Sequence, residues 1–153
     1  MPIGVDIVEI PRMQRIIERT PRFLERVFSP AERSYVAHKH KAAQAQHYAA
    51  FWAAREATLK ALGTGFKGMQ LDDVSVGHEE SGRPFLILQG QAAARADELG
   101  IEDWELSISH TRSVAVANVA GLRQVDRPKP QVEAPDPHEE LAREFKRLRR
   151  ELA

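Results

Sequence analysis

The sequence predicts an α+β fold, in which a largely antiparallel sheet packs against one long central helix. Two observations support this class. The opening residues PIGVDIVEI alternate and are rich in β-branched side chains, which predicts a strand over residues 2–9. Residues 42–62 are rich in alanine, the residue with the highest helix propensity, which predicts one long helix.

Two short helices are expected between the first strand and the long helix. A helical segment follows Pro11 and is interrupted at Pro21. Residues 29–32, Ser-Pro-Ala-Glu, have the capping-box pattern with proline at the first helical position, so they begin a second helix toward His38. The long helix then ends at Gly63, which fits the left-handed position that commonly terminates a helix.

The rest of the domain is expected to hold two pairs of short strands separated by a helix. Residues 80–83 have the composition of a hairpin turn, Gly100 closes the helix, and residues 111–113 form a tight turn. The expected elements are strands over 73–76 and 84–88, a helix over 90–99, and strands over 104–110 and 114–119.

Length and composition limit the class of protein. The 153 residues with 42% hydrophobic content suit one compact domain, and no apolar run approaches the roughly 20 residues that cross a bilayer. With no secretion signal and no cysteine, a cytoplasmic location is the default expectation. Lysine plus arginine equals aspartate plus glutamate at 22 each, which argues against a strongly basic nucleic-acid-binding protein.

The composition changes near residue 122, so we divide the chain into a domain over 1–122 and a tail over 123–153. Prolines in 127–130 and 134–137 predict a stiff linker. The final HEELAREFKRLRREL predicts a charged amphipathic helix, which either stays solvated or docks on a neighbouring subunit or partner. Its apolar residues at helical spacing are Leu141, Phe145, Leu148 and Leu152.

Three charged residues are the first candidates for chemistry. Asp6 lies in the middle of the first strand, and Glu56 and Lys60 lie one turn apart on the long helix. A buried carboxylate needs a partner, and two carboxylates with water and phosphate oxygens form a suitable incomplete shell for Mg²⁺. The alternatives are an exposed strand face or a structural salt bridge for Asp6, and an exposed Glu56–Lys60 pair.

Two further stretches are weaker candidates. Residues 63–65, Gly-Thr-Gly, can turn backbone amides toward an anion or simply stop the helix. Ser109 lies on one face of a late strand and His110 on the other, where a lone histidine is more often structural. The sequence has no protease triad, Walker loop or zinc-ligand spacing.

Taken together, these stretches resemble the holo-acyl carrier protein synthase family, the small magnesium-dependent 4'-phosphopantetheinyl transferases. They recur in the family's order and cover nearly all of residues 3–120, which implies that 1–122 adopts the 4'-phosphopantetheinyl transferase fold. The matching stretches are GVDIVEI, FSPAER, WAAREATLKALGTG, LDDVSV, GRPFLILQGQA and SISHTRSVAVANV.

The resemblance implies a reaction used in fatty acid biosynthesis. A serine of an acyl carrier protein attacks the β-phosphate of coenzyme A, takes up phosphopantetheine and releases 3',5'-ADP. Asp6 and Glu56 would hold Mg²⁺, Lys60 would contact phosphate, and either Glu56 or a water on the metal would take the serine proton. The remaining coenzyme contacts implied are Gly63, Thr64, Gly65, Ser109, His110 and Thr111.

The resemblance also implies two kinds of protein partner. The first is an acidic carrier protein, which would dock on an arginine-rich segment. The docking positions are Arg12, Ile16, Arg19 and Arg22. The second partner is the chain itself, because the family typically forms homotrimers with each coenzyme site between adjacent subunits.

Two positions depart from the common family pattern, because Phe51 stands where arginine is frequent and Arg55 where lysine is frequent. A phosphate contact would then be missing or come from Arg55, Lys39 or Lys41. The aromatic Trp52 and the lost charge also resemble transferases that serve carrier domains of multifunctional fatty acid synthases.

Two other functions remain open at this point. A magnesium-dependent hydrolase of coenzyme A or of a nucleotide pyrophosphate would use the same carboxylate pair with water as the nucleophile. A non-catalytic assembly subunit would keep the fold and dock through its helical tail.

Overall fold

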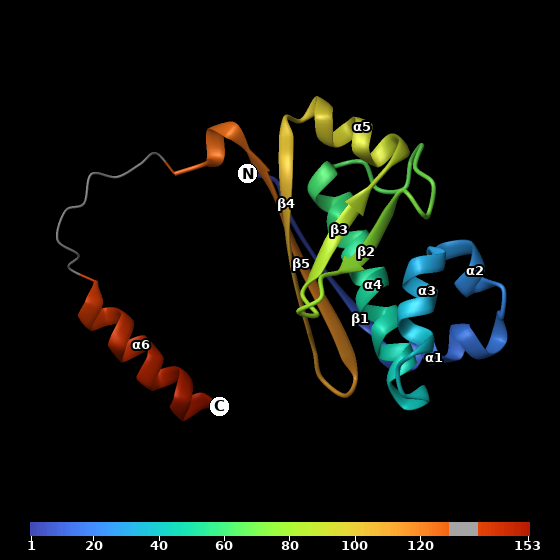
Figure 1. The fold of residues 1–153 in the computed structure, drawn as a ribbon, viewed down its shortest axis with the longest axis horizontal. Coiled ribbons are helices and arrows are strands. Elements are labelled where there is room, and N and C mark those ends of the chain that lie inside the picture. Colours follow the sequence, from blue (N-terminus) through green and yellow to red (C-terminus); the bar gives the residue numbers. More distant parts are fainter. Residues whose placement is uncertain (129–137) are drawn as a thin grey trace.

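The computed structural model describes residues 1–128 and 138–153, with the side chain of Glu140 left aside. Figure 1 shows these elements along the chain. In order they are β1 (Ile3–Glu9), α1 (Ile10–Arg19), α2 (Phe23–Val27), α3 (Pro30–Ala37), α4 (Lys41–Leu62), β2 (Val74–His78), β3 (Pro84–Leu88), α5 (Gly90–Glu98), β4 (Ile101–His110), β5 (Val114–Arg123), a 3-10 turn (Gln124–Asp126) and α6 (Glu139–Leu152).

The strands form two separate antiparallel sheets, one ordered β1-β5-β4 and the other β2-β3. The predicted antiparallel pairing is confirmed, and the division into two sheets is new. In the larger sheet Asp6 of β1 pairs with Ala117 of β5, which in turn pairs with Ile108 of β4. Asp6 therefore lies midway along β1, an edge strand of this sheet.

The long helix α4 packs directly against β1, and small residues permit the close approach. Ala53 and Ala57 of α4 are fully buried. A Cβ atom on Gly4 of β1 would lie 1.9 Å from the carbonyl oxygen of Ala57, so only glycine fits at this crossing. The alanine-rich composition of the helix and the glycine in GVD therefore serve the same contact, and that contact holds Asp6 beside α4.

The predicted start of α3 and the predicted end of α4 are both confirmed. The side chain of Ser29 accepts a hydrogen bond from the Glu32 amide and the reciprocal bond is present, which completes the capping box of α3. Gly63 ends α4 in the left-handed conformation with φ of 73°. The helix α2 has no local signal in the sequence. Its Val27 is buried, so tertiary packing stabilises this one-turn helix.

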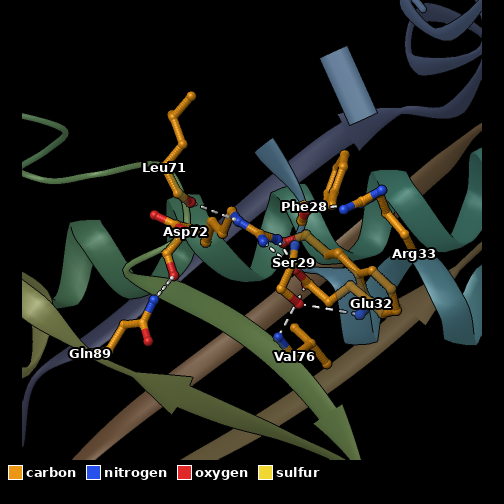
Figure 2. Close-up of polar contacts among 10 residues, drawn as sticks. Phe28, Ser29, Glu32, Arg33, Leu71, Asp72, Val76 and Gln89 are labelled. Atoms are coloured by element: carbon orange, nitrogen blue, oxygen red, sulfur yellow. Dashed lines mark hydrogen bonds and ion pairs between the residues drawn. The ribbon is translucent and has the colours of Figure 1, made fainter. Parts of the chain in front are cut away.

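A buried ion pair joins α3, α4 and β2 (Figure 2). Arg55 is 1% exposed, donates to both oxygens of Glu32, and donates through Nε to the Leu71 carbonyl at 3.1 Å. Glu32 also accepts from the Val76 amide at 3.2 Å. Of the alternatives for the phosphate contact, the one that used Arg55 is wrong, because its guanidinium is held inside the core. Phe51 is also buried, at 1% exposure.

The face of β1 that points away from α4 carries apolar side chains. Figure 1 shows α4 and the smaller sheet on one side of the β1-β5-β4 sheet. On the opposite side Ile3 is 67%, Val5 49% and Ile7 64% exposed. Exposed apolar side chains grouped on one face are typical of interaction surfaces.

The tail contains the predicted helix, α6, whereas 129–137 of the predicted linker lie outside the described residues. Figure 1 draws α6 apart from the other elements. In the part of the chain that the structure describes, no helix combines the length and the apolar character needed to cross a bilayer.

Candidate active site

The alternation of β1 decides where Asp6 points. Val5 and Ile7 face outward, so Asp6 turns toward α4, where its side chain is 17% exposed. The Lys60 ammonium lies 2.9 Å from Asp6 Oδ1 and donates to the Val5 carbonyl at 3.0 Å. Among the described residues, the ion-pair partner of Lys60 is Asp6 and not Glu56. The alternative of an exposed Glu56–Lys60 pair is therefore wrong.

Glu56 lies one helical turn before Lys60 and shares a cavity with Asp6. The cavity has a volume of about 440 Å³, and its wall includes Asp6, Glu56, Arg12, Ile16 and Trp52. Burial, followed by the negative charge of Asp6, raises the pKa of the Glu56 carboxyl, and Lys60 opposes this effect. The structure thus brings together the two carboxylates that the sequence predicted as a pair.

The acid pair fits a hard divalent cation. Carboxylate oxygens are the preferred ligands of Mg²⁺, which typically takes one or two carboxylates and fills its shell with water and phosphate oxygens. A bound cation would offset both the burial and the negative charge of Asp6 that raise the pKa of Glu56. Within the described residues no cluster of three or more acidic, histidine or cysteine side chains forms a fuller metal site.

Two of the four predicted docking residues lie in the wall of this cavity. Arg12 and Ile16 of α1 line its wall. Arg19 ends α1, Arg22 precedes α2, and both side chains are exposed. A protein that binds across α1 would therefore reach the entrance to the acid pair.

Sequence reasoning assigned no place in the site to Trp52, although this residue forms part of the cavity wall. Its ring centroid lies 5.9 Å from that of Phe23 in α2 and 5.9 Å from that of Phe66 beyond α4. The available signal was its position four residues before Glu56, which places both on one helix face.

In the loop after α4, the backbone amides of Gly63 and Thr64 cap the end of the helix. The Gly63 amide donates to Leu59 at 3.0 Å and the Thr64 amide donates to Leu59 at 3.4 Å. The Thr64 hydroxyl donates to the Gly65 carbonyl at 3.2 Å. The amides of Gly63 and Thr64 therefore end the helix, which was one of the two alternatives, and the predicted contact of this loop with the coenzyme stays a prediction.

Ser109, His110 and Thr111 lie elsewhere on the same chain. His110 and Thr111 line a second cavity of about 370 Å³ beside Gln46, near the start of α4. Gln46 and Glu56 are ten residues apart on one helix, which corresponds to about 15 Å along its axis. The Thr111 hydroxyl accepts from the amides of Ser113 and Val114 and so closes the β4–β5 turn. Within the single chain, His110 and Thr111 therefore line a cavity separate from the one that Asp6 and Glu56 line.

Comparison with known proteins identifies the class of this fold and site. The model of the 4'-phosphopantetheinyl transferase superfamily matches residues 2–117. The crystal structure of holo-(acyl-carrier-protein) synthase from Neisseria meningitidis has a TM-score of 0.72 at 28% identity, covering 80% of this chain and 98% of that one. The Helicobacter pylori synthase in complex with coenzyme A has a TM-score of 0.67 at 31% identity, covering 78% and 99%.

Curated relatives narrow the class further. Holo-(acyl-carrier-protein) synthase of Koribacter versatilis is 45% identical over 118 residues, covering 76% of this chain and 93% of that protein. The protein of the same name from Caldanaerobacter subterraneus is 41% identical over 115 residues, covering 75% and 89%. The chain therefore belongs to the 4'-phosphopantetheinyl transferase superfamily and, within it, to the holo-(acyl-carrier-protein) synthases.

Proposed function

We propose that this enzyme transfers 4'-phosphopantetheine from coenzyme A to a serine of an acyl carrier protein or carrier domain. The observation that carries the proposal is the shared cavity of Asp6 and Glu56 beside Lys60, in a chain of this family. Relatives that bear the synthase name, one of them in complex with coenzyme A, support the choice of substrates.

In the proposed reaction the serine hydroxyl oxygen forms a bond to the β-phosphorus of coenzyme A. The bond from that phosphorus to the bridging oxygen breaks, and 3',5'-ADP leaves with the electron pair. Glu56 accepts the serine proton on a carboxylate oxygen, acting as a general base in the cavity that it lines. Lys60 places a positive charge where charge builds on the phosphate oxygens.

Asp6 and Glu56 are the proposed ligands of Mg²⁺. When bound, the ion supplies charge neutralisation of the pyrophosphate. The pairing of Lys60 with Asp6 keeps that carboxylate turned toward α4. Lys60, Gly63, Thr64 and Gly65 are then the proposed coenzyme contacts of the same subunit, because the loop directly follows Lys60 on α4.

For the carrier protein we propose docking on α1 and the start of α2. The residues are Arg12, Ile16, Arg19 and Arg22. The exposure of the three arginines and the position of Arg12 and Ile16 in the cavity wall support this surface. Carrier proteins are acidic, so basic side chains would attract them and orient the serine toward the acid pair.

We further propose a homotrimer in which Ser109, His110 and Thr111 of a second subunit complete each coenzyme site. The separation of about 15 Å along α4 between the cavity beside Gln46 and Glu56 supports a second subunit as the source. The exposed apolar face of β1, with Ile3, Val5 and Ile7, supplies a surface for the contact. The cytoplasmic location belongs to this proposal as well.

The direct test is incubation of the purified chain with coenzyme A, Mg²⁺ and an apo carrier protein, followed by intact mass spectrometry of the carrier. The proposal expects the carrier to gain the mass of one phosphopantetheine group. Cleavage of coenzyme A with an unmodified carrier would instead establish the hydrolase. An unmodified carrier with intact coenzyme A, across a panel of carriers and carrier domains, would favour the assembly subunit.

A further inference from the structure

The helix α6 carries an apolar stripe with the spacing of a coiled coil. The side chains of Leu141, Phe145, Leu148 and Leu152 are separated by four, three and four residues, which is the heptad pattern of alternating d and a positions. They are 63%, 71%, 46% and 88% exposed, so nothing in the described part of the chain covers them. The helix lies beyond residues 2–117, which the superfamily model matches.

The charges beside the stripe specify the partner and its direction. With Leu141 and Leu148 at d positions, Glu144 occupies a g position and Arg149 the following e position. In a parallel coiled coil a g residue faces the e residue five places further along the neighbouring helix, which pairs Glu144 with Arg149 of a second copy. An antiparallel arrangement would instead face g with g and bring Glu144 and Glu151 together.

Contacts within α6 leave these charges available. Arg147 is the partner of both glutamates, at 3.8 Å from Glu144 and 3.9 Å from Glu151, and all three side chains are more than half exposed. Exposed pairs at such distances are weak. Arg149 has no ion pair among the residues that the structure describes.

We infer that the three α6 helices of one homotrimer pack together as a short parallel coiled coil. This inference rests on the proposed homotrimer. Cyclic symmetry relates the three tails by rotation about one axis, so the helices run in the same direction, as the charge pattern requires. A helix of 14 residues is marginal alone, and tethering to an assembled core raises the effective concentration of the other two copies.

The chain between the two described parts permits this contact. The ten steps from Pro128 to His138 span at most about 35 Å when extended, so each tail stays near the core from which it emerges. The inferred role is to lock the trimer outside the transferase site, in a segment that the superfamily model does not include.

Cysteine cross-linking of the full chain tests the inference, because the sequence contains no cysteine. Leu148→Cys places a thiol in the apolar stripe, and Arg150→Cys is the matched control on the opposite side of the same helix. Under mild oxidation we expect Leu148→Cys chains to form disulfide-linked dimers at least about tenfold faster than Arg150→Cys chains. Equal rates would overturn the inference, because the stripe would then face solvent or another partner.

Charge exchange tests the pairing independently. In the Leu148→Cys background, Arg149→Glu should slow disulfide formation by setting glutamate against Glu144, and the double change Glu144→Arg with Arg149→Glu should restore the rate. Failure of the double change to restore the rate would contradict the parallel register.

Light scattering and the carrier-modification assay on the same samples test the trimer and the transfer reaction separately from the coiled coil. Trimers that modify the carrier but show no preference for the Leu148 thiol would overturn the coiled coil alone. Monomers would overturn the trimer and the coiled coil together, and trimers that cross-link as expected but modify no carrier would overturn the proposed reaction alone.

Discussion

At the scale of single residues, the buried ion pair of Arg55 and Glu32 links α4 to α3 and β2. Both side chains are essentially without solvent contact, and together they reach backbone groups of Leu71 and Val76 (Figure 2). Removing one partner of a buried pair leaves the other charge uncompensated, which typically costs about 3–5 kcal/mol.

We predict that Arg55→Met lowers the free energy of unfolding by about 3–5 kcal/mol in urea denaturation. The matched control is Arg83→Met, because Arg83 pairs with Glu105 at 2.8 Å but is 61% exposed. Exposed pairs contribute little, so the control should change stability by less than about 1 kcal/mol. Similar losses in the two variants would show that burial of the Arg55 pair is unimportant.

The pairing of Arg55 with Glu32 also marks a limit of sequence reasoning. The two residues are 23 positions apart, and the sequence around either residue does not predict their contact. In contrast, Asp6 and Glu56 were predicted as a pair through a resemblance that covers both motifs, and they do share a cavity. The resemblance supplied the long-range partner that local periodicity cannot supply.

At the scale of elements, α3, α4 and β2 meet around a group of aromatic and histidine rings. The Tyr35 ring stacks on His78 at 3.7 Å between centroids, and His47 meets Tyr35 edge-on at 5.7 Å. Burial lowers the pKa of both histidines, with Lys39 as the next cause in each case. His110 and His78 further lower the pKa of His47, and Glu32 opposes the effect at His78.

We predict a loss of stability on acidification through this group. The folded-state pKa of each histidine lies below the ordinary value of 6.5, so the unfolded chain binds protons first. Stability is therefore complete above pH 6.5 and falls as the pH drops toward the folded values. In thermal unfolding from pH 7.5 to 5, His78→Gln should show a smaller decrease in Tm than the unmodified chain. An identical pH profile would rule out a contribution from His78.

The helix α1 carries a prediction about partner binding. Reversing Arg19 and Arg22 to glutamate should weaken binding of an acidic carrier protein by at least about tenfold at low salt, with a smaller effect as salt screens the charges. Titration calorimetry or fluorescence anisotropy measures the affinity. Arg83→Glu, in the turn before β3, is the control. Equal affinity of the α1 variant and the control would remove the docking surface.

Among the elements, boundaries with local signals were predictable and those fixed by packing were not. The capping box of Ser29 and the left-handed Gly63 define helix ends through their own backbone chemistry. The helix α2 carries no such signal and depends on contacts such as the edge-on packing of Phe23 on Phe28 at 6.0 Å. The strand runs were recognisable, but their division into two sheets depends on which strands meet after folding.

At the scale of the whole molecule, two observations agree with the proposed assembly of subunits. The cavity with His110 is separated along α4 from the cavity with Glu56. The apolar face of β1 is exposed on the single chain. Both observations are explained if neighbouring subunits cover that face and exchange coenzyme contacts, and α6 would then reinforce the same assembly.

We predict that Ile3→Arg breaks the assembly, because Ile3 is 67% exposed on the apolar face and a desolvated charge there opposes association. Light scattering should show a shift from trimer to monomer mass, with loss of carrier modification. Val125→Arg is a suitable control, since Val125 is 81% exposed outside the sheet. An Ile3 variant that remains a trimer would show that this face is not the interface.

The central claim is that Asp6 and Glu56 act together on one Mg²⁺ ion that binds the pyrophosphate of coenzyme A. The most direct measurement is the rate of carrier modification as a function of Mg²⁺ concentration for the unmodified chain, Asp6→Asn and Glu56→Gln, with the exposed Glu98→Gln as control. The account predicts transfer that stops in EDTA, a control that matches the unmodified chain, and acid-pair variants that are inactive or require at least about tenfold more Mg²⁺. Full transfer in EDTA, or an unchanged Mg²⁺ requirement in both acid-pair variants, would contradict it.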